Sequence, residues 1–120
     1  MIPPVFSILN ASSAVKALLG TTPLRVFPWG EAPQTTQKPY ATYIVFNGQP
    51  ENTQGDAPEV DVLGTQVDIW AETVSSCVSV AEAVRDALEP YAHMTDFSSA
   101  SPEEETGLFR QRMDFDFYVS

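Results

Sequence analysis

The stretch Gly107-Leu-Phe-Arg-Gln-Arg-Met-Asp-Phe-Asp-Phe-Tyr-Val119 decides the fold. Its odd positions carry apolar side chains (Phe109, Met113, Phe115, Phe117 and Val119), and its even positions carry charged ones (Arg110, Arg112, Asp114 and Asp116). This period of two predicts a strand with one buried face. Because burying one large apolar side chain is worth about 1.5 to 3 kcal/mol, we expect other elements of the chain to cover that face.

Two helical regions are available to cover it. The first is marked by apolar residues at helical spacing, namely Val5, Ile8, Leu9, Val15, Leu18 and Leu19. Asn10-Ala-Ser-Ser13 interrupts this stripe, so the pattern fits one helix or two, with Gly20 as the stop. The second region opens at Thr73 or Ser75 and ends at Pro90. Its expected apolar stripe is Cys77, Ala81, Val84, Leu88 and Tyr91.

The remaining strands are read from short apolar runs between turn residues. We expect a short edge strand at Leu24–Phe27, and longer strands at Tyr40–Phe46, Leu63–Ala71 and Ala92–Phe97. The polar connection from Gly48 to Asp61 is either a mobile loop or an extended hairpin. Helices and strands do not alternate regularly, which predicts an α+β fold: a mostly antiparallel sheet of about four to five strands with two helices packed on one face.

Composition narrows the function classes. A chain of 120 residues fits a single domain spanning residues 1–120. It has one cysteine, Cys77, and lacks a basic start followed by an apolar run, so we expect a cytoplasmic product without an internal disulfide. No apolar run approaches the roughly 20 residues of a membrane span. The formal net charge of -10 disfavours direct nucleic-acid binding, because such binding depends on basic side chains that neutralise phosphates.

Residue patterns typical of catalysis are missing from the sequence. The one histidine, His93, has no nearby Cys or second His, and the six glycines are too dispersed for a phosphate-binding loop. Glu103, Glu104 and Glu105 are consecutive and lack the ligand spacing of a calcium loop. We therefore predict no catalytic residue, no metal, no cofactor and no enzyme activity.

The outer face of the predicted sheet is more informative. It carries Trp70, Tyr118 and Phe46, and such an aromatic face is either covered by a loop of the same chain or used to bind a partner. Arg110 and Arg112 lie on the same face, where Asp68 on a neighbouring strand can oppose one of them. We predict such a cross-strand or intersubunit ion pair.

Several segments, in this order, resemble one protein family. They are Pro28-x-Gly-x-Ala-Pro-Gln34, Pro39-Tyr40, Pro50-Glu-Asn52, Gln66-Val-Asp-Ile-Trp70, Ala81-Glu-Ala-Val-Arg-Asp-Ala-Leu88 and Thr106-Gly-Leu-Phe-Arg-Gln-Arg-Met-Asp-Phe115. The set, which spans nearly the whole chain, resembles the tail-completion or tail-terminator proteins of long-tailed, non-contractile bacteriophages and related prophages. The Ser-rich, triple-Glu segment from Asp96 to Thr106 departs from the pattern by its length and acidity.

The resemblance implies a structural virion protein with an α+β fold and no catalysis. It implies a homo-oligomeric ring, typically a hexamer, that caps the head-proximal end of the tail tube, ends tube polymerisation and provides the head-joining surface. The implied partners are the chain itself, the tail tube protein and the head-tail connector proteins. DNA passes through the ring without specific binding, and the protein resides in the host cytoplasm during assembly and then in the virion tail.

The residues that carry these contacts follow from the physical reading. For the oligomer interface we expect the outer-face set Trp70, Phe46, Arg110, Arg112, Asp114, Asp116 and Tyr118. For a lumen-facing or tube-facing loop we expect Glu51, Asp56, Glu59 and Asp61. Two alternatives remain: another neck or head-tail connector component, and a small acidic protein-binding module that mimics nucleic acid.

Overall fold

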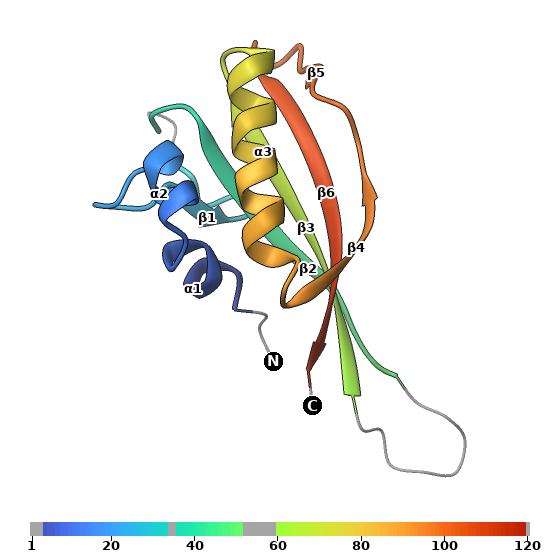
Figure 1. Cartoon of the computed structure of the whole chain (residues 1–120). Helices are drawn as coiled ribbons and strands as arrows, with labels where there is room; N and C mark the ends of the chain where they lie inside the picture. Colours follow the sequence, from blue (N-terminus) through green and yellow to red (C-terminus); the bar gives the residue numbers. More distant parts are fainter. Residues whose placement is uncertain (1–3, 34–35, 52–59, 120) are drawn as a thin grey trace.

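The chain forms one mixed sheet with helices on one face (Figure 1). The computed structural model describes residues 4–33, 36–51 and 60–119. The elements are α1 (Val5–Asn10), α2 (Ser13–Leu19), β1 (Val26–Pro28), β2 (Tyr40–Glu51), β3 (Val60–Ala71), α3 (Val74–Leu88), β4 (Ala92–Phe97), β5 (Ser101–Pro102) and β6 (Phe109–Val119). The strand order is β1-β2-β3-β6-β4, with β5 also paired to β6. The predicted α+β class is confirmed.

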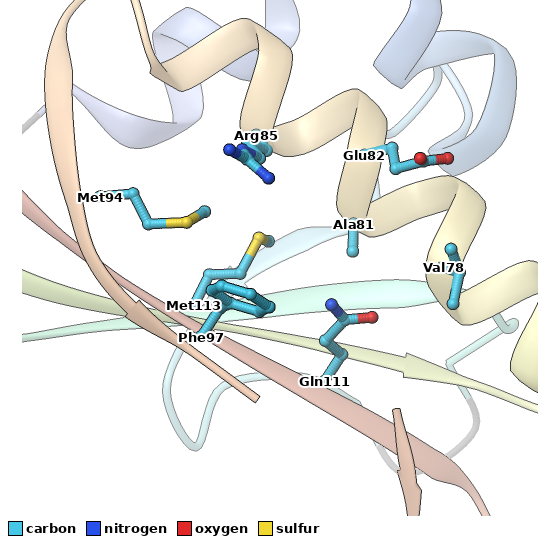
Figure 2. Close-up of a pocket in the computed structure, with 8 residues that line it drawn as sticks. All are labelled: Val78, Ala81, Glu82, Arg85, Met94, Phe97, Gln111 and Met113. Carbon is cyan, nitrogen blue, oxygen red and sulfur yellow. The ribbon is translucent and has the colours of Figure 1, made fainter. Parts of the chain in front are cut away.

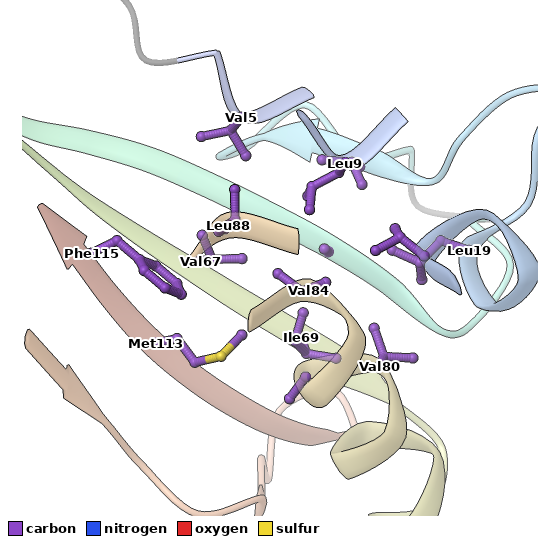
Figure 3. Close-up of a cluster of buried hydrophobic side chains, with 14 of the residues drawn as sticks. Val5, Leu9, Leu19, Val67, Ile69, Val80, Val84, Leu88, Met113 and Phe115 are labelled. Atoms are coloured by element: carbon purple, nitrogen blue, oxygen red, sulfur yellow. The ribbon is translucent and has the colours of Figure 1, made fainter. Parts of the chain in front are cut away.

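Strand β6 is the element that the sheet is built around. It pairs antiparallel with β3 on one side and with β4 and β5 on the other. Met113, Phe115 and Phe117 alternate along it and are at most 2% exposed, so the period of two seen in the sequence does mark a buried face. Met113 and Phe115 face α3, which contributes Val80, Val84 and Leu88 to the same core (Figure 3). Phe117 belongs to this core as well.

The helices begin and end where local chemistry requires it. The side chain of Ser12 accepts a hydrogen bond from the Val15 N–H, so the first helical region is two helices rather than one. Thr73 caps α3 in the same way, through the Ser76 N–H. Gly20 follows α2 with a φ of 88°, a backbone conformation that residues with a Cβ rarely adopt, so glycine is favoured here.

Two details of α3 differ from the sequence prediction. Tyr91 was expected in the buried stripe but is 64% exposed, because the helix ends at Leu88 and Pro90 prevents its continuation. Val80 takes a place in the stripe that the sequence reading did not assign to it. Residues beyond the end of the helix, such as Tyr91, do not belong to its buried stripe.

The polar connection from Gly48 to Asp61 was expected to be either a mobile loop or an extended hairpin. At both of its ends, β2 and β3 pair as in an extended hairpin. Strand β2 continues to Glu51 and pairs through Val60, although this region contains Pro50 and few apolar residues. The paired strands project beyond the helical layer (Figure 1). The Asp96 to Thr106 segment, whose length and acidity depart from the family pattern, contains the two-residue strand β5. None of the helices in the described ranges has both the length and the apolar character needed to cross a bilayer.

Replacing Phe115 with Ala should lower the free energy of unfolding by about 3 to 5 kcal/mol, because the side chain is fully buried and its loss leaves a cavity. The matched control is Tyr118→Ala, on the same strand but 53% exposed, which should change stability by no more than about 0.5 kcal/mol. Urea unfolding followed by circular dichroism measures both. Equal losses for the two variants would contradict the assignment of the buried face.

Candidate functional site

The outer face of the sheet carries most of the residues predicted to make contacts. Across β3 and β6 the register places Trp70 opposite Arg110, Asp68 opposite Arg112 and Gln66 opposite Asp114. Charged side chains thus form a row along β6 while β3 presents an aromatic ring, an acid and an amide. The structure brings these residues together on one surface, as the alternation in the sequence predicted.

Asp68 and Arg110 form the cross-strand ion pair that the sequence predicted. Arg110 Nη2 lies 3.2 Å from Asp68 Oδ2, and Gln66 Nε2 donates to the same oxygen at 3.0 Å. Arg110 Nη1 also lies 3.7 Å from Glu103 Oε2, which ties the segment after β5 to the sheet. The Asp68 carboxylate is only 1% exposed, so it depends on these donors for its charge to be tolerated.

Trp70 is held by contacts within its own chain. Its ring stacks on Tyr40 with centroids 6.2 Å apart, and the Arg110 guanidinium lies 5.2 Å from the ring centroid. Trp70 Nε1 donates to Thr42 Oγ1 at 3.1 Å. Trp70 is 8% exposed, so this aromatic residue is covered by its own chain. Tyr118 is 53% exposed and is not covered by the chain.

The second arginine of the row, Arg112, contacts two aspartates. Arg112 Nη2 donates to Asp96 Oδ2 at 3.3 Å, and Arg112 Nε lies 3.6 Å from Asp114 Oδ1. Burial raises the pKa of the Asp114 carboxyl. The Arg112 charge opposes this shift, while Asp96, Asp68 and Asp116 add to it. The far end of the outer face is therefore an acidic cluster with one arginine in it.

Other predicted site residues fall where side chains are not described. Phe46 and Glu51 lie on β2 and Asp61 lies on β3, and in each case only the backbone is placed. Asp56 and Glu59 lie outside the described residues. Of the predicted tube-facing acidic set, Glu51 and Asp61 thus lie at the outer end of the paired strands of the projecting hairpin, and their role remains a prediction.

The described part of the chain offers little for catalysis. Burial raises the pKa of the Cys77 thiol to about 11, so the thiol stays protonated at neutral pH and is a poor nucleophile. His93 is exposed on β4. Within residues 4–33, 36–51 and 60–119, no three His, Cys, Asp or Glu residues converge as metal ligands would.

A groove between α3 and β4 was not anticipated from the sequence. Its volume is about 80 Å³, and it is lined by Val78, Ala81, Glu82, Arg85, Met94, Phe97, Gln111 and Met113 (Figure 2). Phe97 is 60% exposed and Val78 is 38% exposed, so apolar surface remains open at its mouth. The signal available in the sequence was Phe97, an aromatic residue ending a strand, and Val78, an apolar residue beside the helix stripe.

The fold is shared with a known virion protein. The structure is similar to a chain described as belonging to the virion of a native gene transfer agent particle, with a TM-score of 0.71 and 17% sequence identity. The alignment covers 96% of this chain and 90% of the other. At this level of identity the likeness concerns the fold. No curated protein matches the sequence significantly.

Sequence comparison supplies the family. Residues 3–120 match the model of the family described as tail completion protein gp17. The chain belongs to this family, and its role is that of a structural protein of a phage tail. The resemblance found in the sequence motifs is thereby confirmed. This class of virion component is structural rather than enzymatic.

Removing Arg110 should destabilise the protein because it leaves the Asp68 carboxylate buried without its charged partner. We expect Arg110→Gln to lower the free energy of unfolding by about 2 to 3 kcal/mol, less than for a fully buried pair because Arg110 keeps some solvent contact. Adding Asp68→Asn should recover much of that loss. The control Arg85→Gln breaks an exposed pair with Glu89 and should cost about 0.5 kcal/mol or less. Equal costs for the two arginine variants would be the contrary result.

The raised pKa of Asp114 predicts a pH dependence with a defined sign. Folding favours the protonated carboxyl, so its contribution is fully present below the unfolded pKa of about 3.9 and is lost as pH rises through the folded value. Relative to wild type, Asp114→Asn should therefore gain stability between pH 3.5 and pH 7. The neutral control Thr95→Ala, which loses a hydroxyl bonded to the Asp114 carbonyl oxygen, should differ from wild type by a constant amount. Urea unfolding at several pH values measures both, and a trend of opposite sign would contradict the assignment.

Proposed function

We propose that this protein forms a homo-oligomeric ring, typically a hexamer, that caps the head-proximal end of the phage tail tube. The ring ends tube polymerisation and offers the surface that the head-tail connector proteins bind. The observation that carries the proposal is the family match over residues 3–120, which assigns tail completion to nearly the full length of the chain. Assembly takes place in the host cytoplasm, and the product resides in the virion tail.

We assign different contacts to the projecting β2–β3 hairpin and to the body of each subunit. Its two strands extend beyond the helical layer, so the body of the subunit is left free to contact its neighbours (Figure 1). Glu51, Asp56, Glu59 and Asp61 give the hairpin an acidic character. We assign it to the lumen or to the rim that meets the tail tube protein. An acidic lining does not hold phosphates, which suits a ring that DNA crosses without specific binding.

At β1 and at the β4–β5 edge, subunit contacts in this ring run through side chains rather than through sheet continuation. Strand β1 has three residues and ends in Pro28, which lacks an N–H. At the other edge, the N–H of Phe97 donates to the Asp96 side chain at 2.9 Å, and β5 contains Pro102. Strand β1 and the β4–β5 edge therefore carry features that protect against strand addition, whereas β2 extends past β1 beyond Tyr43.

The outer-face set remains our proposed contact surface, and its exposed members are the ones that we expect to make the contacts. Tyr118, Arg112 and Asp116 keep surface available, whereas Trp70 and Arg110 are engaged within the chain. Asp114 lies in the same row, and Phe46 is retained from its position on β2. In this arrangement Trp70 and Arg110 hold the surface rigid while its exposed neighbours make the contact.

The proposal is tested by complementation of a phage that lacks this chain. Without the protein, tails should be abnormally long and should fail to join heads, and wild-type protein should restore both properties. Deleting Thr53–Ala57 should impair tail-length control or head joining, whereas the surface control Tyr91→Ala should not. Electron microscopy gives tail lengths and the fraction of heads joined to tails.

Two outcomes of the same experiment count against the proposal. Tails of normal length that merely fail to attach would favour another neck or connector role. Normal, joined particles in the absence of the protein would exclude a role in tail completion. If only the Thr53–Ala57 deletion behaves as wild type, the capping function stands and the assignment of the hairpin is wrong.

A further inference from the structure

Strand β2 has an open edge along its outer part. Strand β1 pairs with β2 only at Ala41–Tyr43, and just past the end of β1 the Trp29 N–H donates to the Tyr43 carbonyl oxygen at 2.8 Å. Strand β2 then continues to Glu51 and pairs with β3 on its other side (Figure 1). In the part of the chain that the structure describes, no strand lies beside β2 on the β1 side beyond Tyr43. We call this stretch of β2, from Ile44 to Glu51, the open β2 edge.

The hydrogen bonds that β2 makes to the β1 side show which way its backbone groups point. The Ala41 N–H donates to the Arg25 carbonyl oxygen at 3.0 Å, and the Tyr43 carbonyl oxygen accepts from the Trp29 N–H. Because successive residues of a strand direct their N–H and C=O groups to opposite sides, Val45 points the same way as Ala41 and Tyr43. Its N–H and C=O groups therefore face the open β2 edge.

A β-bulge changes which residues face this edge farther along β2. The register shifts by one residue between Val45 and Asn47, so beyond the shift it is Gly48 and Pro50 that face the open β2 edge. Gly48 offers an N–H and a C=O there, without a side chain that would hinder the approach of a second backbone. Pro50 offers only its C=O, and its missing N–H costs no bond to β3. The edge thus offers donors at two residues and acceptors at three, which suits a short added strand.

The hairpin that carries the open β2 edge has one sign of charge at its outer end. Residues 39–84 contain no Lys, Arg or His, whereas the connection from Gly48 to Asp61 contains Glu51, Asp56, Glu59 and Asp61. Pairing with the same edge of a second copy would bring like charges together, which is unfavourable. A strand that carries Lys or Arg is attracted instead, so the charge of the hairpin is complementary to a basic partner.

We propose that the open β2 edge binds an extended, basic segment at the end of the tail tube by strand addition. Backbone hydrogen bonds from Val45 and Gly48 hold the added strand in place. Its Lys or Arg side chains lie near the carboxylates of the hairpin, which gives the contact its selectivity. The inference rests on the assignment of the hairpin to the rim that meets the tube in the proposed function, and it names how that contact is made.

Amide hydrogen exchange tests the geometry of this contact. The probe is tail tubes purified from particles that lack this chain, mixed with the wild-type protein. Exchange at the Val45 and Gly48 amides, followed by mass spectrometry at residue resolution, should slow at least about tenfold on binding. The Ala41 amide already donates to the Arg25 carbonyl oxygen, so it is the internal reference and should change little.

A proline substitution tests the backbone donor. Gly48→Pro removes the N–H at the open β2 edge, and because Gly48 points away from β3 it spares the hydrogen bonds between β2 and β3. The dissociation constant for the tubes should rise at least about tenfold. Gly48→Ala keeps the N–H and is the matched control, which should bind the tubes as wild type does. Thermal unfolding checks that both variants remain folded.

Charge reversal tests the chemistry of the partner. Glu51→Lys and Asp61→Lys should each weaken binding to the tubes at least about threefold, and added salt should weaken the binding of wild type. The control Asp86→Lys makes the same change of charge at an exposed position of α3, away from the hairpin, and should leave binding unchanged.

The contrary outcomes separate this contact from the capping role. Binding to the tubes with unchanged exchange at Val45 and Gly48 would overturn strand addition and leave the capping role standing. Binding that is insensitive to both Glu51→Lys and Asp61→Lys would overturn the assignment of a basic partner. Slowed exchange at the same two amides in the free protein, as its concentration rises, would identify a second copy as the occupant and overturn the proposal. A protein that does not bind the tubes at all would count against the capping role as well.

Discussion

The structure depends on the burial of one face of β6. Met113, Phe115 and Phe117 supply the apolar area that holds α3 against the sheet, and β3 and β4 pair with the backbone of the same strand. Because side chains alternate along a strand, the burial of this face fixes the charged residues on the opposite face. A slip of one residue would bury the arginines and aspartates, so the register of the sheet and the position of the outer-face row are set together.

The charged residues along the outer face of β6 stabilise the subunit itself, whether or not a partner is bound. Arg110 joins Asp68, Glu103 and the face of Trp70, and Arg112 joins Asp96 and Asp114. The Arg110 contacts hold the Trp70 ring and connect the segment around β5 to the sheet. Side chains that are already held by internal contacts lose less conformational freedom on association, which favours a subunit that assembles by docking of preformed surfaces.

The sequence predicted what depends on local periodicity and turn chemistry. It identified β6, its buried face, β4, the start of α3 at Thr73 or Ser75, its stop at Pro90, and an ion pair of Asp68 with one of two arginines, which is Arg110 in the structure. It missed β5, because two residues carry no periodic pattern. It placed Tyr91 in the core, because the spacing of apolar residues does not show that the helix ends before Tyr91. The groove beside α3 also escaped, since it arises from the lateral placement of a helix over a sheet, which the sequence pattern does not encode.

The central claim is that copies of this chain form a closed ring at the head-proximal end of the tail. Cryo-electron microscopy of tails isolated from assembled particles tests it most directly, because the position, copy number and orientation of the protein are read from one map. The account predicts a single cyclic layer of this fold at the head-proximal end, with the β2–β3 hairpins directed toward the lumen or the tube. The fold found at the distal tip, or as a single copy without cyclic neighbours, would contradict it.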